Sequence, residues 1–120
     1  MFNVIVNCHA RRVRKLVAAM EKKFRARGIG YRIFYTERTG DAGKYARSLS
    51  ESGGKDFIVV GGDGTLNEVV SGLADPSSCT LGLVPAGTGN DFAASVHIPH
   101  GIRALDLILG KEARPIDYIE

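Results

Sequence analysis

The sequence has little cysteine, no tryptophan and no long run of apolar residues. Its two cysteines, Cys8 and Cys79, are too few for a disulfide framework, and nothing else in the chain indicates export. The apolar segment 2–6 is far shorter than the core of a signal peptide. No segment approaches the roughly 20 apolar residues that span a bilayer. These absences favour a protein of the reducing cytoplasm.

The composition is typical of one soluble globular domain. The chain has 120 residues, 44% hydrophobic and 24% charged, which allows a modest core and excludes the disordered and fibrous classes. The net charge is +3, and many of the basic residues fall between Arg11 and Arg27. We interpret that segment as the solvent-facing side of a helix, and attraction to an anionic membrane or a polyphosphate is the functional alternative. Nucleic acid is disfavoured as a partner because no aromatic residues interleave with the basic ones.

Strand and helix signals alternate along the chain. Short strands rich in Val and Ile are followed by segments with apolar residues at helical spacing, and glycines stand where several of these segments end. This alternation predicts a parallel sheet covered by helices on both faces, a Rossmann-like three-layer α/β domain. The predicted strands are 2–6, 31–35, 56–60, 80–84 and 115–119, and the predicted helices are 11–27, 39–52, 65–73, a short one near Asp91, and 101–109.

A glycine-rich turn, 61–65, follows the third predicted strand directly and opens a helix; its sequence is GGDGT. Its glycines permit positive φ and keep side chains away from the backbone, and a helix start adds unpaired N–H groups, so the turn is suited to a phosphate group. Asp63 among such amides requires a compensating metal ion or hydrogen bond, and Mg²⁺ suits both carboxylate and phosphate oxygens. The structural alternative is a tight turn in which Thr65 caps the helix and Glu68 closes a capping box.

A second turn of this kind, Pro85 to Phe92, follows the fourth predicted strand. Parallel strands end at one edge of a sheet, so the two turns should lie together where open α/β sheets bind ligands. The structural alternative is a turn in which Asn90 or Asp91 caps a helix. Two such turns, each with Thr, Asn and Asp, favour a function.

These two turns resemble the diacylglycerol kinase family. The segment 61–65 is similar to a loop shared by diacylglycerol kinases, sphingosine kinases, NAD kinases and phosphofructokinases, and its continuation LNEVVSGL (66–73) resembles the lipid-kinase branch. The run LGLVPAGTGNDFA (81–93) is similar to the same branch, and the resemblance extends from the first predicted strand to the end of the chain.

The resemblance implies a kinase in which ATP, with Mg²⁺, binds an N-terminal domain and gives its γ-phosphate to a lipid hydroxyl. Residues 1–120 would form that nucleotide-binding domain, and the family's C-terminal β-rich domain, with the catalytic base, is absent from the chain. We therefore expect the isolated chain to be inactive as a kinase. The implied nucleotide contacts are Asn7, Thr36, Gly61, Gly62, Asp63, Gly64, Thr65, Leu66, Asn67, Glu68, Gly87 and Thr88.

The acids Asp63 and Asp91 are the expected Mg²⁺ ligands, and Asp63 is the expected catalytic residue. The first loop departs from the family pattern, which has Asn-Pro, small residues and Gly, because this chain has NCHAR at 7–11. Arg11 could still meet a phosphate there. We interpret His9 as a surface loop residue and Cys8 as a small buried residue.

Other functions stay open. NAD kinase and sphingosine kinase would use the same loop, although 66–68 and 85–92 argue against NAD kinase. A non-catalytic nucleotide-binding or regulatory module is the hypothesis from another class. We expect a cytoplasmic protein that meets its lipid acceptor at the inner face of the membrane, and a second copy of the chain, in a homodimer, is a candidate partner.

Overall fold

The computed structural model describes residues 1–10 and 13–86. Up to residue 86 each predicted strand and helix is present, although the third helix begins two residues earlier than predicted and a short 3₁₀ helix was not predicted. The helices predicted near Asp91 and at 101–109, and the strand at 115–119, lie outside the described residues. The observed order is β1 (Phe2–Asn7), α1 (Val13–Ala26), β2 (Tyr31–Thr36), α2 (Asp41–Glu51), β3 (Asp56–Gly61), α3 (Asp63–Gly72), the short 3₁₀ helix η1 (Pro76–Ser78) and β4 (Thr80–Pro85).

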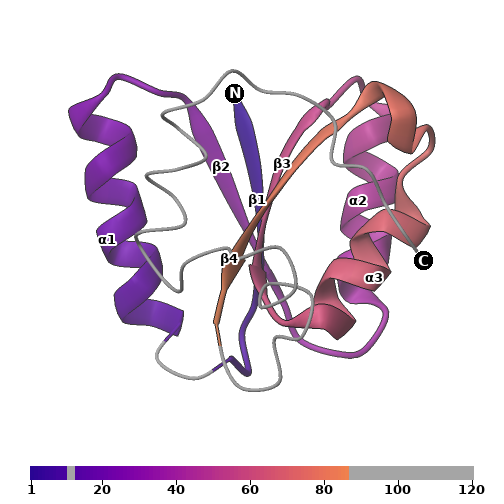
Figure 1. Ribbon diagram of the computed structural model, residues 1–120, viewed down its shortest axis with the longest axis horizontal. Helices are drawn as coiled ribbons and strands as arrows, with labels where there is room; N and C mark the ends of the chain where they lie inside the picture. The colour runs from indigo at the N-terminus through magenta and orange to yellow at the C-terminus, as the bar shows by residue number, and fades with distance from the viewer. Residues whose placement is uncertain (11–12, 87–120) are drawn as a thin grey trace.

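The described strands form one parallel sheet with the order β2-β1-β3-β4 (Figure 1). The chain begins in the middle of this sheet. After β1 it adds β2 on one side, and it then returns to add β3 and β4 on the other. The direction of winding therefore reverses between β1 and β3, and in open α/β sheets this reversal marks the crevice where ligands bind.

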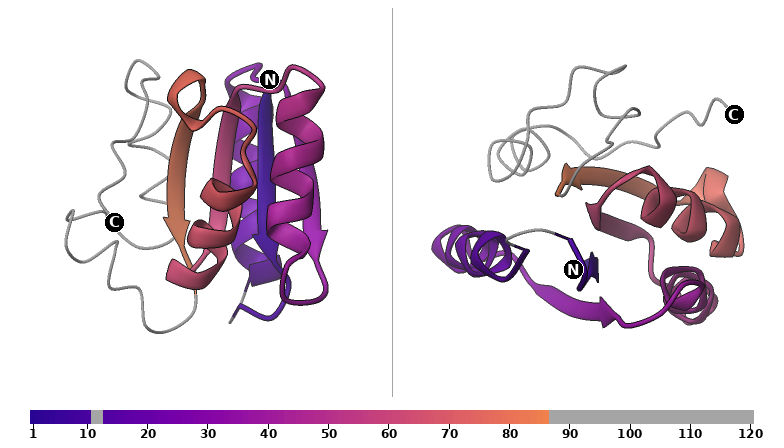
Figure 2. Two further views of the ribbon diagram at one scale, coloured as in Figure 1. Left: turned by 90° about the vertical axis from the view of Figure 1, so that its right-hand side faces the viewer. Right: turned by 90° about the horizontal axis from the view of Figure 1, so that it is seen from below.

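Helices cover both faces of the sheet, which confirms the predicted three-layer α/β fold. Helix α1 lies on one face, and α2 and α3 lie together on the other (Figures 1 and 2). Successive strand side chains point to opposite faces, so each strand supplies both cores. The core under α1 contains Val4, Val6, Ile58, Val60, Val17, Met20 and Phe24, and the core under α2 and α3 contains Ile5, Phe57, Val59, Ala46, Leu66 and Val69.

Two glycines bring α2 and α3 unusually close. A Cβ placed on Gly72 would overlap the carbonyl oxygen of Gly43, and a Cβ placed on Gly43 would lie 3.0 Å from the carbonyl oxygen of Glu68. Side chains at these positions would force the helices apart. The close approach places the second half of α3, from Glu68 to Gly72, beside the start of α2.

Helix α3 begins earlier than predicted. Its first residue is Asp63 and its N-cap is Gly62, which has an extended backbone and makes no side-chain capping hydrogen bond. The capping box of Thr65 and Glu68, which was the structural alternative for this turn, does not form. The Glu68 carboxylate instead accepts a hydrogen bond from the N–H of Gly40, because α2 packs so close to α3.

Candidate functional site

The carboxyl ends of the four strands lie at one edge of the sheet, and the right-hand view of Figure 2 looks onto it. The register places Asn7 beside Thr36 and Gly61 beside Pro85. The loops that follow β1, β2 and β3 all leave from this edge. The structure thus brings together the ends of strands that carry the predicted contacts Asn7, Thr36 and Gly61.

Asn7, Gly61 and Thr65 meet where the winding reverses. A Cβ placed on Gly61 would lie 3.1 Å from Thr65 Oγ1 and 3.2 Å from Asn7 Cβ. A side chain at this position would require Thr65 or Asn7 to shift by a few tenths of an ångström. The Asn7 side chain is itself oriented, because its Oδ1 accepts a 3.0 Å hydrogen bond from the N–H of His9.

The glycines of the turn 61–64 provide room and not an unusual backbone conformation. The described glycines with positive φ are Gly28, Gly40 and Gly53, so the expected use of positive φ in this turn is wrong. Gly62, for example, has φ −109°. Of the described residues, none has an atom within 4 Å of a Cβ placed on Gly64. They therefore leave space beside Gly64 at the start of α3.

The first turn of α3 presents backbone N–H groups to this space. The first bond of the helix joins the N–H of Leu66 to the carbonyl of Gly62 at 3.1 Å. The amides of Gly64 and Thr65 precede it, and amides in that position have no acceptor within their own helix. Asp63, half-buried at the first helical position, also benefits from the positive end of the helix dipole.

Three predicted contacts on α3 differ in their surroundings. Leu66 is 2% exposed and belongs to the core, and its N–H is already bonded to Gly62, so its part is packing. The Glu68 carboxylate is held by Gly40. Asn67 is exposed on the helix.

Thr36 is the buried polar residue of this edge. Its side chain is 6% exposed, and no hydrogen bond joins its hydroxyl to another described residue. Most buried polar groups in proteins have a hydrogen-bond partner. A hydroxyl in this position is therefore able to serve a bound ligand, as donor or acceptor.

The β2–α2 loop (Glu37–Gly40) follows Thr36 directly. Asp41 Oδ2 accepts hydrogen bonds from the N–H groups of Glu37 at 2.9 Å and Arg38 at 3.0 Å. These two backbone bonds hold the pKa of the Asp41 carboxyl below its ordinary value. The backbone of the loop is thus held by the carboxylate of Asp41, the residue that follows the loop.

The structure gives His9 a contact that the sequence did not predict. His9 is exposed, as expected, but its Nε2 donates a 3.0 Å hydrogen bond to the carbonyl of Glu37. The sequence signal for this contact was the presence of a histidine in the first loop, at a position where the family pattern described above has small residues. Cys8 is half-buried, less than predicted, and Arg11 lies outside the described residues.

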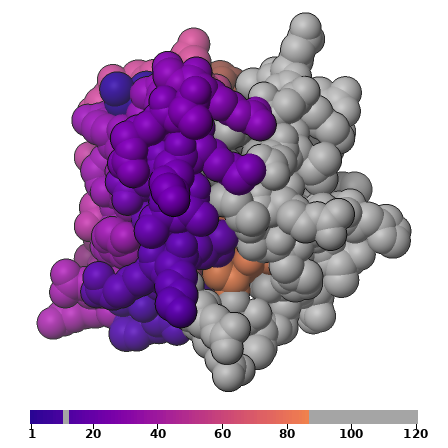
Figure 3. Space-filling model, turned by 90° about the vertical axis from the view of Figure 1, so that its left-hand side faces the viewer, coloured from indigo at the N-terminus to yellow at the C-terminus, as the bar shows by residue number. Residues whose placement is uncertain are grey.

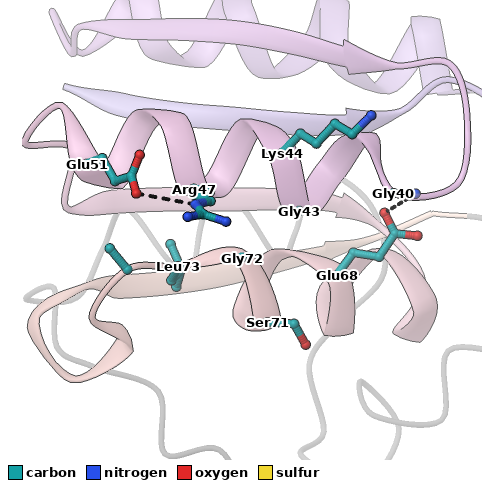
Figure 4. Close-up of a pocket in the computed structure, with 10 residues that line it drawn as sticks. Gly40, Gly43, Lys44, Arg47, Glu51, Glu68, Ser71, Gly72 and Leu73 are labelled. Carbon is teal, nitrogen blue, oxygen red and sulfur yellow. Dashed lines mark hydrogen bonds and ion pairs between the residues drawn. The ribbon is translucent and has the colours of Figure 1, made fainter.

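A groove of about 660 Å³ runs between α2 and α3 on the outer side of the helix pair (Figure 4). Gly43 and Gly72 form part of its lining, with Lys44, Arg47 and Ser71 around them. Glu68 is the one predicted nucleotide contact that lines it. The groove is therefore separate from the converging residues Asn7, Gly61 and Thr65.

Gly87, Thr88 and Asp91 lie outside the described residues. Among the residues that are described, no three His, Cys, Asp or Glu side chains gather in a way that could hold a metal ion. None of the described helices is long and apolar enough to cross a membrane.

Known proteins match this chain over nearly its whole length. The family model for the diacylglycerol kinase catalytic domain matches residues 1–120. The chain belongs to the diacylglycerol kinase catalytic domain family. Diacylglycerol kinases of Staphylococcus aureus strains JH9 and NCTC 8325 are each 41% identical over 106 residues, which make up 87% of this chain and 33% of the relative.

Solved structures agree with this assignment. A crystal structure of a diacylglycerol kinase from Bacillus anthracis strain Sterne has a TM-score of 0.78 and 31% identity, and the match covers 92% of this chain and 40% of that chain. This member of the diacylglycerol kinase family therefore spans about a third of the length of the curated relatives it matches. The resemblance predicted from the segments 61–73 and 81–93 is confirmed, and with it membership of a lipid kinase family.

Proposed function

We propose that the carboxyl edge of this sheet binds ATP with Mg²⁺, and that the full-length enzyme transfers the γ-phosphate to a lipid hydroxyl. The observation that supports this most is the meeting of Asn7, Gly61 and Thr65 beside the open first turn of α3. A phosphate above that turn would accept hydrogen bonds from the N–H groups of Gly64 and Thr65. The positive end of the helix dipole would favour it there.

We propose further contacts for the bound nucleotide and its cation. Thr36 contributes a buried hydroxyl, Asp63 and Asp91 hold the cation, and Asp63 is the proposed catalytic residue. Bound Mg²⁺ would neutralise charge between these acids and the phosphate oxygens. The proposed nucleotide contacts are Asn7, Thr36, Gly61, Gly62, Asp63, Gly64, Thr65, Asn67, Gly87 and Thr88.

An enzyme with a lipid acceptor must contact a membrane surface, and the basic side chains of α1 support such a contact. Four exposed basic side chains, Arg14, Lys15, Lys22 and Arg25, project from a helix whose one acid, Glu21, is half-buried and accepts a hydrogen bond from the Tyr31 hydroxyl. Figure 3 shows α1 at the surface of the face turned away from α2 and α3. Each basic residue near an anionic leaflet contributes attraction of about 1 kcal/mol. We propose peripheral contact with the inner face of the membrane on this basis.

Nucleotide binding is tested by adding Mg-ATP to the chain and following amide chemical shifts by NMR. We expect shifts at Gly62 and Gly64 and none at Gly53, which ends α2 at the opposite edge. The binding should be weak, because a site lined on one side leaves the nucleotide solvated. Absence of shifts at Gly62 and Gly64 with millimolar Mg-ATP would contradict the proposed site.

Phosphoryl transfer is tested with γ-labelled ATP and vesicles that contain diacylglycerol. The full-length enzyme should label the lipid, and removal of Mg²⁺ by a chelator should abolish the label. We expect the 120-residue chain alone to bind nucleotide without labelling lipid, since positioning and charge stabilisation dominate this chemistry and need a closed site. Turnover by the chain alone that Asp63→Ala abolishes would contradict this second expectation.

A further inference from the structure

The β2–α2 loop is held from both sides by residues of other elements. On the α3 side, Glu68 Oε1 accepts the Gly40 N–H at 3.0 Å, a bond between residues 28 apart in the sequence (Figure 4). On the β1 side, His9 Nε2 donates to the Glu37 carbonyl at 3.0 Å, also across 28 residues. The two ends of the loop are thus tied to the two elements that flank the proposed phosphate position.

Three of the four backbone amides of this loop donate hydrogen bonds inside the protein. Asp41 accepts those of Glu37 and Arg38, and Glu68 accepts that of Gly40. An anion would have to displace a carboxylate to reach them. The loop is therefore built as a support, and its contribution to a ligand comes through Thr36, the buried residue that directly precedes it.

The approach of Glu68 to the loop depends on three glycines. Gly40 has φ +97°, a left-handed conformation that favours glycine. Gly43 and Gly72 allow α2 and α3 to pack closely enough for the carboxylate to reach Gly40. The bond is thus prepared by backbone features on both helices.

His9 holds the loop that follows β1. It makes two hydrogen bonds there, from its N–H to Asn7 Oδ1 and from its ring to the Glu37 carbonyl. The second bond also joins this loop to the β2–α2 loop.

We propose that Glu68 and His9 are positioning residues that hold the β2–α2 loop, and with it Thr36, in place for the nucleotide. This inference rests on the proposed nucleotide site. It gives the Glu68 carboxylate a role that requires no contact with the ligand. It also means that the loops after β1, β2 and β3 support one another at the carboxyl edge.

Single substitutions test the two contacts. Glu68→Ala and His9→Ala should each weaken Mg-ATP binding by about tenfold, the effect of one such hydrogen bond. Glu68→Gln retains an acceptor and His9→Gln retains a donor of similar reach, so both should recover most of the affinity. Glu51→Gln removes a carboxylate that pairs with Arg47 on the exposed side of α2 and should leave the affinity unchanged.

Hydrogen exchange of the Gly40 amide, measured without nucleotide, separates positioning from direct contact. Glu68→Ala should speed this exchange, while the melting temperature shows that the variant is folded. Weaker ATP binding with unchanged Gly40 exchange would overturn the inference, since Glu68 would then contact the nucleotide itself. Affinity that survives both alanine substitutions would also overturn it. If the unaltered protein binds no nucleotide, the proposed function fails instead. The contact can then still be tested by itself: if Glu68→Ala leaves the exchange rate of the Gly40 amide unchanged, the hydrogen bond from Gly40 to Glu68 is overturned.

The double variant His9→Ala, Glu68→Ala tests whether the loops act as one unit. Residues that act on one element give non-additive effects, so the combined loss of affinity should be smaller than the product of the two single losses. A combined loss equal to that product would mean that the two residues act independently. That result would overturn the coupling between the loops.

Discussion

The two edges of the sheet use similar residues in different ways. At the amino edge, polar side chains bind one another: the Thr80 hydroxyl donates to Asp56 at 2.6 Å, and the Tyr31 hydroxyl donates to Glu21 at 2.9 Å. At the carboxyl edge, the Thr36 hydroxyl has no described hydrogen-bond partner although it is almost fully buried. The described polar side chains named at the amino edge bind one another, whereas the carboxyl edge contains a buried hydroxyl, that of Thr36, without a described partner.

The glycines that end helices at the amino edge differ from those of the turn 61–64, although Gly40 in the β2–α2 loop also has a positive φ. Gly28 and Gly53, which end α1 and α2 at the amino edge, have φ of +67° and +99°. There glycine serves the backbone conformation of a helix end. Gly61 and Gly64 at the carboxyl edge have no such conformation, and Gly61 instead allows Asn7 and Thr65 to approach. Gly61 therefore serves the packing of neighbouring side chains and not a turn conformation.

The substitution with the largest expected effect is Asp63→Asn at the carboxyl edge. It keeps the shape of the side chain but removes the charge that we propose holds Mg²⁺. The kcat of the full-length enzyme should fall by about 10²-fold or more, the scale of a lost electrostatic group. The melting temperature should change little. A destabilised variant with normal kcat would show that Asp63 only stabilises the start of α3.

A pair of glycine substitutions compares the two edges directly. Gly61→Ala adds a Cβ 3.1 Å from Thr65 Oγ1, so Thr65 must move, and we expect a loss of Mg-ATP affinity of about fivefold to tenfold with a smaller effect on stability. Gly53→Ala forces a side chain into a left-handed conformation at a cost of about 1–2 kcal/mol. It should lower the melting temperature and leave the affinity unchanged. Equal effects of both substitutions on affinity would remove the distinction between the edges.

Two threonines give a finer comparison. Thr36→Val removes a buried hydroxyl that has no described partner, so it should leave stability unchanged or raise it slightly, while lowering ATP affinity about threefold to tenfold. Thr80→Val removes the bond to Asp56 and should cost about 1 kcal/mol of stability with no change in affinity. Calorimetric titration and thermal unfolding measure both quantities. A Thr36→Val variant with normal affinity would exclude this hydroxyl as a contact.

Most of the fold could be predicted because its signals are local. In β3 the residues from Phe57 to Val60 are all buried, and such a continuous apolar run predicts a strand covered on both faces. The glycine-rich turn 61–65 likewise predicted the end of a strand and the start of a helix. Both predictions depend on neighbours in the sequence.

The contacts across the carboxyl edge could not be predicted because they join distant segments. Glu68 stands three residues after Thr65, which is the local pattern of a capping box, yet it binds Gly40 because Gly43 and Gly72 admit α2. His9 reaches Glu37 from a loop that departs from the family pattern. The sequence contains these residues, but only the packing of the helices and loops brings them together.

The smallest expected effect concerns Asp41 and pH. Its carboxylate accepts two backbone hydrogen bonds in the β2–α2 loop, which lower its pKa in the folded protein relative to the ordinary value of 3.8. In the unfolded chain this acid takes up its proton at a higher pH than in the folded one. Its contribution to stability is therefore complete above the unfolded value and is lost as the pH falls through the folded value.

Asp41→Asn should remove this pH dependence and retain the loop. The amide oxygen of Asn can accept the same two N–H groups, so Mg-ATP affinity near neutral pH should change little. The melting temperature of the variant should fall less than that of the unaltered protein as the pH is lowered below about 4. Glu51→Gln, which removes one negative charge from an exposed side chain paired only along its own helix, measures the general effect of the charge. Parallel melting curves for Asp41→Asn and the unaltered protein would mean that the two bonds from Glu37 and Arg38 do not stabilise the charged form. The loop would then depend on Glu68 and His9 alone, and the effects of those two substitutions should be correspondingly larger.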